Sequence, residues 1–491
     1  MIKIEVLDGK NTIGGTKILI GDKEFSFFLD FGKNFKTYSL YFEEFLSPRT
    51  LTGIYDLWKL NLIPKINNIY REDIFPPYLN EEKRVINLSG VFLSHAHLDH
   101  SGFISLIKEN IPIITSSITK KFLEAIEVIN PELFTQFTLV KKRYWNEDFG
   151  EKVSLSNKKK KKDGDFNEIE EKNRNFIEIC DEKYENKLDN IKFISFKTDH
   201  SILGSLGFFI EMNGIGIAYT GDIRFHGKNS KYSYLFVNEL KKLKPTILIT
   251  EGTRVRSEKG NKKEEDVFKS SLKVINDFKG KVVISDFGPR NIERLETFLN
   301  IAKETKRYLL ITYKDALLLD LLKDHFNLID DDHILIIHEK KSDDRKYLRE
   351  LKEKYKNKIV TPKIINDNLG DFIICYSFYD FVNLIDLEIN DGAYIYSTSE
   401  AYTEEQEIDI KRLFNWLKYF NLKIFGVEIN GDKPIFSGDY HSSGHASFDD
   451  IIWMINEINP EFILPVHTEN LEEFVKIFGE GRVIKEETFE L

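Results

Sequence analysis

One short segment holds the residue types that bind divalent metal ions. In SHAHLDHSG, residues 94–102, three histidines and one aspartate fall within six positions, directly after an apolar run at 91–93. Imidazole and carboxylate groups are the usual protein ligands of zinc and similar ions. On a tight loop, side chains two residues apart can converge on one ion, and the remaining pair can bind a second. The candidate ligands are His95, His97, Asp99 and His100. A histidine-rich surface turn is the alternative interpretation.

Four further candidates share one position, at the end of an apolar run that predicts a β-strand. They are His200, Asp222, Glu251 and His467. Layered α/β enzymes place their sites in the loops that follow such strands. A single histidine or aspartate there more often caps an element or hydrogen bonds within the core. Because these residues accompany the cluster at 95–100, we predict one metal site assembled from several loops.

A second histidine pair occurs in the sequence HSSGH at residues 441–445. Its glycine permits a close approach of the backbone, and hydroxyl, imidazole and backbone N–H groups can together bind a phosphate. His441 and Ser443 are therefore candidate substrate-binding residues. An ordinary turn with two exposed histidines is equally compatible with this segment.

The elements that must position these residues alternate along the chain between short apolar runs and amphipathic helical patterns. Such alternation predicts an α/β or layered αββα architecture. The stretch 262–429 has its own set of strands and helices. It holds three histidines, none in a ligand-like cluster, whereas the segments on either side carry the candidate ligands. This arrangement predicts one domain inserted into another.

The predicted outer domain covers residues 1–261 and is completed by residues 430–491, and residues 262–429 form the inserted domain. Within the first part, charged residues become frequent between 141 and 190, with a lysine run at 158–162. A charge run of this kind is usually solvated, so we expect a mobile charged insertion here. Contact of these lysines with nucleic acid is the alternative.

The composition excludes several classes of protein. Hydrophobic residues make up 41% of the 491 residues, which is enough for large buried cores, and the net charge is −10. An acidic chain does not coat nucleic acid by bulk electrostatics, so a polyanion would bind at a local patch or at metal ions. Two cysteines exclude a disulfide scaffold. We find neither a signal-peptide pattern nor an apolar run of membrane-spanning length, and expect a cytoplasmic protein without membrane contact.

The candidate residues resemble the motifs of the metallo-β-lactamase superfamily, and more narrowly of its β-CASP branch, to which ribonuclease J belongs. The matching positions are Asp30, the HxHxDH segment at 95–100, His200, Asp222, Glu251, His445 and His467. The resemblance implies an α/β fold, namely an αββα metallo-β-lactamase sandwich with an inserted α/β β-CASP domain.

The resemblance also implies two divalent metal ions, with zinc as the first expectation and manganese or magnesium as alternatives. The ligands it implies are His95, His97 and His200 for one ion, and Asp99, His100 and His467 for the other. Asp222 would bridge the two ions, and Asp30 would orient the ligands from behind.

The activity that the resemblance implies is that of a metal-dependent ribonuclease, acting as an exonuclease, an endonuclease or both. A hydroxide activated by the metal pair would attack the RNA phosphodiester, leaving 5′-phosphate and 3′-hydroxyl ends. Asp99 and Asp222 would act through the metals. His445 would give a proton to the leaving oxygen, and Glu251 would hold its other ring nitrogen.

Single-stranded RNA is the expected partner, and a homodimer is one assembly that the resemblance allows. A cleft between two domains suits a single strand, whose phosphates basic residues can follow. The arginines offered as backbone contacts are Arg254, Arg256, Arg290 and Arg294.

Two alternatives stay open at this point. The segment at 95–100 alone is compatible with a metallohydrolase of a small ester, although such an enzyme needs neither the loop at 441–445 nor a large inserted domain. A non-catalytic RNA-processing subunit is the other alternative, but inactive relatives lose metal ligands, and this chain retains every one that the motifs require.

Overall fold

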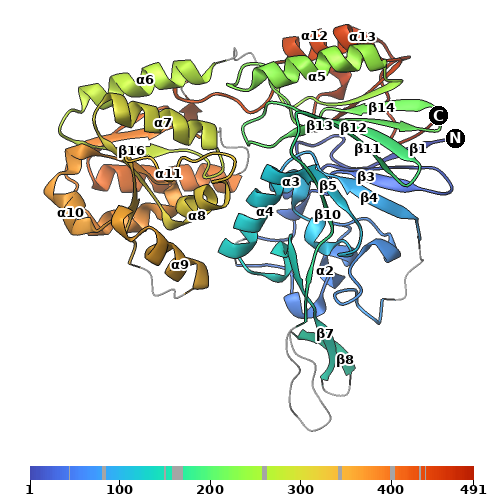
Figure 1. Cartoon of the computed structure of the whole chain (residues 1–491), viewed down its shortest axis with the longest axis horizontal. Coiled ribbons are helices and arrows are strands. Elements are labelled where there is room, and N and C mark those ends of the chain that lie inside the picture. The colour runs from blue at the N-terminus through green and yellow to red at the C-terminus, as the bar shows by residue number, and fades with distance from the viewer. Residues whose placement is uncertain are drawn as a thin grey trace.

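The computed structural model describes residues 1–43, 45–79, 84–148, 151–156, 170–256, 262–340, 345–398, 404–430, 433–436 and 438–491. Two β-sheets pack face to face in one part of the molecule, and a third sheet with its own helices forms the other part (Figure 1). Both termini lie at the end of the two-sheet part that is far from the third sheet.

The first sheet surrounds the N-terminal strands. In spatial order it contains β10 (Phe176–Ile179), β5 (Ile113–Ser116), β4 (Leu88–Phe92), β3 (Ser26–Leu29), β2 (Lys17–Gly21), β1 (Lys3–Asp8) and β26 (Thr488–Glu490). The strands from β3 to β10 pair in parallel, whereas β1 pairs antiparallel with β2 and with β26. Every residue of β2 and β3 is buried, as expected for strands that are covered on both faces.

The second sheet provides most of the strand ends that matter for the site. In spatial order it contains β11 (Lys183–Leu188), β12 (Ile191–Lys197), β13 (Leu206–Met212), β14 (Ile215–Tyr219), β15 (Ile247–Glu251) and β25 (Phe462–Val466). Strands β14, β15 and β25 pair in parallel, so their carboxyl ends meet at one edge of the sheet. Strand β12 also ends at this edge, because it runs antiparallel to β13, which in turn runs antiparallel to β14.

The core between the two sheets is apolar and rich in aromatic rings. The ring of Phe92 from β4 meets the rings of Phe193 and Phe208 from the second sheet, with centroids 5.0 and 5.4 Å apart and edges facing. Aromatic pairs of this geometry favour a fixed sheet-to-sheet spacing. Fully buried Ile, Leu and Phe residues of both sheets complete this layer.

Helices cover the outer faces of the two-sheet part, which gives the αββα order of layers. These helices are α1 (Phe35–Tyr38), α2 (Tyr55–Lys59), α3 (Leu98–Ser101), α4 (Ser117–Ile129), α5 (Ser230–Leu243), α12 (Phe448–Ile458) and α13 (Leu471–Phe478). Apolar residues of α5, α12 and α13 pack with the second sheet in one cluster. The start of α12 is fixed by a capping box, in which Ser447 and Asp450 each accept the backbone N–H of the other.

The third sheet is parallel throughout the described residues. In spatial order it contains β19 (Ile359–Val360), β18 (Ile334–Ile337), β17 (Tyr308–Ile311), β20 (Phe372–Cys375), β16 (Val282–Asp286), β21 (Gly392–Tyr396) and β22 (Leu422–Phe425). Its helices are α6 (Glu264–Asp277), α7 (Ile292–Glu304), α8 (Tyr313–Leu321), α9 (Lys346–Lys354), α10 (Pro362–Asp367) and α11 (Glu404–Tyr419). In sequence, the whole sheet falls between β15 and β25 of the second sheet.

Three strand pairs lie outside the large sheets. They are β6 (Leu139–Lys141) with β9 (Glu171–Asn173), β7 (Tyr144–Asp148) with β8 (Glu151–Ser156), and β23 (Val427–Asn430) with β24 (Lys433–Phe436). Short 3₁₀ helices complete the connections, at Thr50–Thr52, Asn67–Ile69, Ile104–Leu106, Leu133–Thr135, Lys356–Lys358, Leu369–Asp371, Phe378–Asp386 and Gly438–Tyr440.

The predicted fold class is confirmed, since two packed sheets with outer helices carry an inserted parallel α/β unit. The domain boundaries remain a prediction: 261/262 precedes α6, whereas 429/430 falls inside β23. The segment 141–190, expected to be a mobile insertion, contains paired strands, including β10 and β11 of the two main sheets. Its lysine run at 158–162 lies outside the described residues. Within the described ranges, every helix is too short or too polar to span a lipid bilayer.

Candidate metal centre

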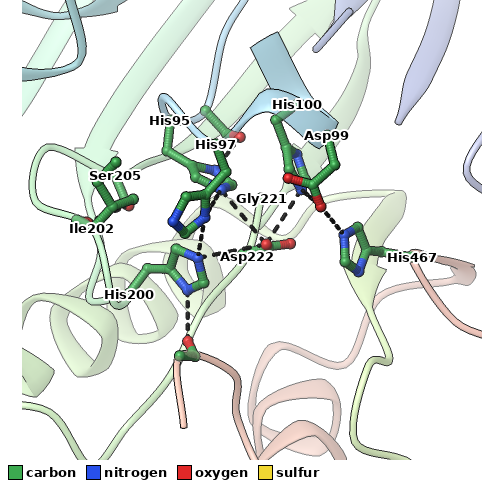
Figure 2. A network of polar contacts seen from close by, with 12 residues as sticks. His95, His97, Asp99, His100, His200, Ile202, Ser205, Gly221, Asp222 and His467 are labelled. Carbon is green, nitrogen blue, oxygen red and sulfur yellow. Dashed lines mark hydrogen bonds and ion pairs between the residues drawn. The ribbon is translucent and has the colours of Figure 1, made fainter. Parts of the chain in front are cut away.

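The loop after β4 holds the first group of candidate ligands. His95 and His100 are buried, while His97 and Asp99 are partly buried around the start of α3. The carbonyl oxygen of Asp99 accepts hydrogen bonds from the backbone N–H groups of Gly15 and Thr16, at 3.0 and 3.1 Å. The loop is therefore held against the β1–β2 connection, and its side chains point toward the second sheet (Figure 2).

Loops from the second sheet bring the remaining candidates to the same place. His200 follows β12, Asp222 follows β14, and His467 follows β25. Donor atoms of His95, His97, His200 and Asp222 lie within 4.8 Å of one another, and so do those of Asp99, His100 and His467. The structure thus brings together all seven side chains that the sequence motifs single out as metal ligands (Figure 2).

Asp222 lies between the two groups. Its Oδ2 atom is 3.6 Å from Nε2 of His95, 3.6 Å from Nε2 of His200 and 3.2 Å from Nε2 of His100. One carboxylate therefore faces ligand nitrogens of both groups, which is the geometry that a bridging ligand requires.

The backbone at the site adopts left-handed conformations in residues other than glycine. Asp30, at the end of β3, has φ 55°, and His467, at the end of β25, has φ 52°. Such conformations are uncommon for residues with a Cβ atom and concentrate at functional sites. At His467 the backbone N–H also donates to the carbonyl of Gly9, at 2.6 Å, which fixes the turn that presents the imidazole.

Asp30 orients the first loop from behind. Its Oδ1 accepts the Ser94 N–H at 2.7 Å, and its Oδ2 accepts from the Ser94 hydroxyl, the Tyr219 hydroxyl and His100 Nδ1 at 2.8, 2.6 and 2.7 Å. Because the Ser94 hydroxyl donates to Asp30, its oxygen is left to accept from Nδ1 of His95, at 2.9 Å. Both histidines are therefore held with Nε2 directed into the site.

Two further histidines are fixed in the same way from the second sheet. His200 Nδ1 donates to the carbonyl of Gly444 at 2.6 Å. Thr253 Oγ1 lies 2.9 Å from Nδ1 of His467, whose Nε2 lies 3.1 Å from Asp99 Oδ2. With the Nδ1 atoms engaged outside, the Nε2 atoms carry the lone pairs that face the site.

The donor set fits metal ions. Nδ1 of His97 lies 3.1 Å from Nε2 of His95 and 3.0 Å from Nε2 of His200, so three ring nitrogens meet where a cation can satisfy them. Nε2 of His100 and Oδ1 of Asp222 are buried without a hydrogen-bond partner among the described residues. An unpaired buried polar group costs about 1–3 kcal/mol, which metal coordination would offset.

The electrostatics of the site agree with this fit. Burial lowers the pKa of His95 and His200 well below the ordinary value and that of His97 to about 3, so these imidazoles are neutral, as metal ligands must be. Burial also opposes a charge on His100, but the carboxylates of Asp222 and Asp99 outweigh it and raise the His100 pKa. These carboxylates therefore attract positive charge, which divalent ions would supply.

Glu251 and His445 form a pair next to Asp222. Glu251, the last residue of β15, accepts the Ile223 N–H with Oε1 at 2.8 Å and His445 Nδ1 with Oε2 at 2.9 Å. His445 Nδ1 also lies 3.9 Å from Asp222 Oδ2. Burial lowers the pKa of His445, but Glu251 and Asp222 outweigh it and raise the pKa to about 9. The His445 side chain retains 20% exposure, whereas Glu251 is buried.

The two substrate-binding candidates of the HSSGH segment, His441 and Ser443, turn toward the protein. Nδ1 of His441 lies 3.5 Å from the carbonyl of Ser397, and burial lowers its pKa to about 3. The hydroxyl of Ser443 accepts the His445 N–H at 3.2 Å, which fixes the loop that carries His445. Neither residue belongs to the groups of converging donor atoms among the described residues.

Sequence reasoning missed an ion-pair network beneath the site. The buried guanidinium of Arg224 donates to Asp199 Oδ1 at 3.3 Å, to the carbonyl of Ser443 at 3.3 Å and to Glu293 of α7. It thereby joins the second sheet, the His445 loop and the inserted unit. In the sequence, only the position of Asp199 next to His200 could have indicated this ion-pair network.

A cavity of about 280 Å³ opens beside His200. Its walls come from the N-terminus of α4, the end of β12 and the segment after α8, represented by Ser117, Thr198 and Phe326. Both parts of the molecule therefore border the space next to the candidate ligands.

Comparisons with known proteins agree with this geometry. Residues 439–477, which carry His445 and His467, match a family model described as the Zn-dependent metallo-hydrolase RNA specificity domain, RMMBL. The chain is 23% identical over 422 residues to ribonuclease J 2 of Streptococcus pyogenes serotype M3, covering 82% of this chain. The match spans 64% of that relative's length.

Among solved structures, the chain resembles a protein of unknown function from Enterococcus faecalis V583, with a TM-score of 0.71, 19% identity and full coverage of both chains. None of these comparisons supports the homodimer that the sequence motifs allowed. The chain thus resembles ribonuclease J 2 in sequence, matches the RNA specificity domain of Zn-dependent metallo-hydrolases at residues 439–477, and has the αββα fold with an inserted α/β unit described above.

Proposed function

We propose that this protein is a metal-dependent ribonuclease with a dinuclear metal centre. The observation that carries the proposal is the convergence of seven His and Asp side chains on two adjacent groups of donor atoms. The match of residues 439–477 to an RNA specificity domain supports RNA as the substrate class. Hydrolysis of RNA phosphodiesters is a reaction for which two neighbouring ions are suited.

In the proposed centre, each group of donors holds one ion. The first site takes the imidazoles of His95, His97 and His200, and the second takes Asp99, His100 and His467. Asp222 contributes to both, because its Oδ2 faces nitrogens of each group. Zinc is the first candidate for a site of imidazoles and carboxylates, with manganese and magnesium as the alternatives. When bound, such ions lower the pKa of water and neutralise charge on a phosphate.

His445 is the proposed proton donor to the leaving 3′ oxygen. Its side chain is partly exposed, and the Glu251 carboxylate holds its Nδ1 at 2.9 Å, so that Nε2 is available to a substrate. A pKa raised to about 9 keeps the imidazole protonated at neutral pH, as a general acid must be. The products are then a 5′-phosphate and a 3′-hydroxyl end.

The two substrate-binding candidates of the HSSGH segment differ in their orientation. Ser443 fixes the backbone of the loop through its bond to His445, and it can present N–H groups to a phosphate. His441 is directed at the carbonyl of Ser397, so a phosphate contact from its ring requires a rotation of the side chain.

A direct experiment tests the proposal. Single-stranded RNA with a 5′-phosphate, labelled at either end, is incubated with the full chain and Zn²⁺, Mn²⁺ or Mg²⁺, with and without a chelator. We expect metal-dependent cleavage, and the product ladder distinguishes exonucleolytic from endonucleolytic attack. His97→Ala should abolish cleavage, whereas His333→Ala, at an exposed histidine of the inserted unit, should not. Failure of all metals to support cleavage of any RNA would overturn the proposal.

The same preparation separates the alternatives that the sequence left open. Turnover of small esters that exceeds RNA cleavage would favour a small-molecule metallohydrolase. RNA binding without metal content or cleavage would favour a non-catalytic subunit of an RNA-processing assembly.

A further inference from the structure

The four arginines that sequence reasoning offered as RNA contacts have different surroundings. Arg294 is fully buried, and its Nε donates to Glu264 Oε1 at 2.5 Å, so it ties α7 to α6. Arg256 is exposed and pairs with Glu473 at 2.8 Å on the outer surface. These two guanidinium groups are occupied by carboxylates and have structural roles.

Arg254 is also engaged by the protein. Its Nη1 donates to the carbonyl of His445 at 3.3 Å, which supports the backbone of the proton-donor loop. Arg254 thus acts on the loop, and a role in contacting RNA phosphates is not needed to explain its position.

Arg290 differs from the other three. It lies in the loop between β16 and α7, and its Nη1 atom is enclosed without a hydrogen-bond partner among the described residues. Arginine remains charged at every physiological pH, so an enclosed N–H of its guanidinium calls for an acceptor. The described protein does not provide one.

The charge of Arg290, in the inserted unit, interacts with the loop after β4 that carries His97 and Asp99. Burial lowers the pKa of Arg290, and the carboxylate of Asp99 acts in the opposite direction. Burial is the main cause of the lowered His97 pKa, and Arg290 adds to it. Arg290 thus interacts electrostatically with two candidate ligands, although the described residues contain no ion pair between Arg290 and Asp99.

The loop that carries Arg290 is held in place and borders open space. The Asn291 N–H donates to the carbonyl of Gly288 at 2.9 Å, and the Asn291 side chain caps α7 by accepting the Arg294 N–H at 3.0 Å. A Cβ atom at Gly288 would meet no other atom within 4 Å. A polymer backbone can therefore approach this turn closely while the arginine keeps its position.

We propose that Arg290 binds a phosphate of the RNA strand next to the scissile bond, clamping the strand between the inserted unit and the metal centre. The proposal rests on the proposed ribonuclease function. A guanidinium presents paired N–H groups that match phosphate oxygens, and a phosphate would supply the acceptor that Nη1 lacks. The inserted unit thus contributes a charged contact of its own to substrate binding.

The test compares Arg290→Met, Arg290→Lys and wild type as full, metal-loaded chains. Arg412→Met, which removes an exposed arginine paired with Asp409 on α11, is the matched control. Binding of a non-hydrolysable single-stranded RNA is measured over a range of salt concentrations, together with kcat and KM for cleavage. Thermal melting of each variant checks the fold, which we expect to be unchanged because Arg290 forms no hydrogen bond or ion pair with another described residue.

For Arg290→Met we expect about tenfold weaker RNA binding and a KM raised by a similar factor. The slope of log K against log salt should fall by about 0.7, the value for one lost phosphate contact on a single strand. Arg290→Lys should keep the slope but recover only part of the affinity. Arg412→Met should match wild type in every measurement. Wild-type binding and slope in Arg290→Met would overturn the inference while the ribonuclease function stands.

Hydrolysis of a small phosphodiester distinguishes failure of the proposed ribonuclease function from failure of the proposed Arg290 contact. If wild type hydrolyses bis(p-nitrophenyl) phosphate but neither binds nor cleaves RNA, the ribonuclease function and the RNA contact both fall. If RNA is cleaved and Arg290→Met changes KM for RNA but not for the small diester, the contact is to a neighbouring phosphate, as proposed. An equal rise in both KM values would place the contact on the scissile group and overturn the assignment to a neighbouring phosphate.

Discussion

The Nε2 atom of His467 lies 3.1 Å from Oδ2 of Asp99, although 368 positions separate the two residues in the chain. Asp99 is placed by α3 after the first sheet's β4, and His467 by the end of β25 in the second sheet. The contact therefore exists only when the two sheets are packed, and the metal centre depends on the assembled sandwich.

Replacing Asp222 with asparagine should abolish metal-dependent cleavage and reduce the metal bound per chain. Its carboxylate faces nitrogens of both groups, so the change weakens both sites together. Metal content by mass spectrometry and RNA cleavage are the measurements. Asp409→Asn, on α11, serves as the control and should retain metal and activity. Retention of two ions per chain by Asp222→Asn would exclude the bridging role.

Asp30→Asn should weaken metal binding by about 10–100-fold, the usual effect of removing a group that orients metal ligands. The amide would place a donor where Oδ2 now accepts from His100 Nδ1 and the Tyr219 hydroxyl. Competition with a zinc chelator measures the affinity, and circular dichroism checks the fold. Unchanged affinity in a folded variant would show that Asp30 has no part in holding the ligands.

His445→Gln should lower kcat by about 10²–10⁴-fold while metal content stays at the wild-type value. As a general acid, His445 acts in its protonated form, so the wild-type rate should fall as the pH rises through its pKa, which the carboxylates of Glu251 and Asp222 raise to about 9. The pH profile of kcat should lose this alkaline limb in the variant. An alkaline limb that persists unchanged would assign the proton to another group.

The inserted unit should lose stability as the pH rises from about 4 to 7. Burial raises the pKa of Asp286 from 3.8 to about 7, so the folded state binds more protons than the unfolded state in this interval. Asp286→Asn should reduce the dependence, because the amide oxygen can still accept from the Tyr394 hydroxyl without a titrating proton. Urea unfolding at pH 5 and pH 8 measures the difference, and an equal loss in both proteins would point to other groups, such as Asp315, whose pKa burial also raises to about 7.

The convergence of the candidate ligands could be predicted from the sequence because each of these residues carries a local signal. His95 and His97 stand in one short loop, and His200 and His467 each follow an apolar strand. Their convergence could be expected because strand ends at one sheet edge meet in space. An inserted α/β unit could be predicted because residues 262–429 have their own alternation of strand and helix patterns.

Other features depend on contacts that no local pattern reports. Arg224 was missed because its role comes from Glu293, which lies in another part of the fold. The direction of His441 could not be foreseen, since the carbonyl of Ser397 that it faces belongs to the inserted unit. The strands β10 and β11 were read as part of a charged insertion because their exposed faces are polar, and their pairing with β5 and β12 is a tertiary effect.

The late position of β25 has a consequence for biosynthesis. While the ribosome makes residues 262–429, β15 has emerged without the neighbour that will cover its outer edge, and the donor group of Asp99 and His100 still lacks His467. The third sheet can form meanwhile, because its strand pairs all lie between residues 282 and 425. The candidate metal centre of a nascent chain is therefore incomplete until translation has passed the last strand of the second sheet.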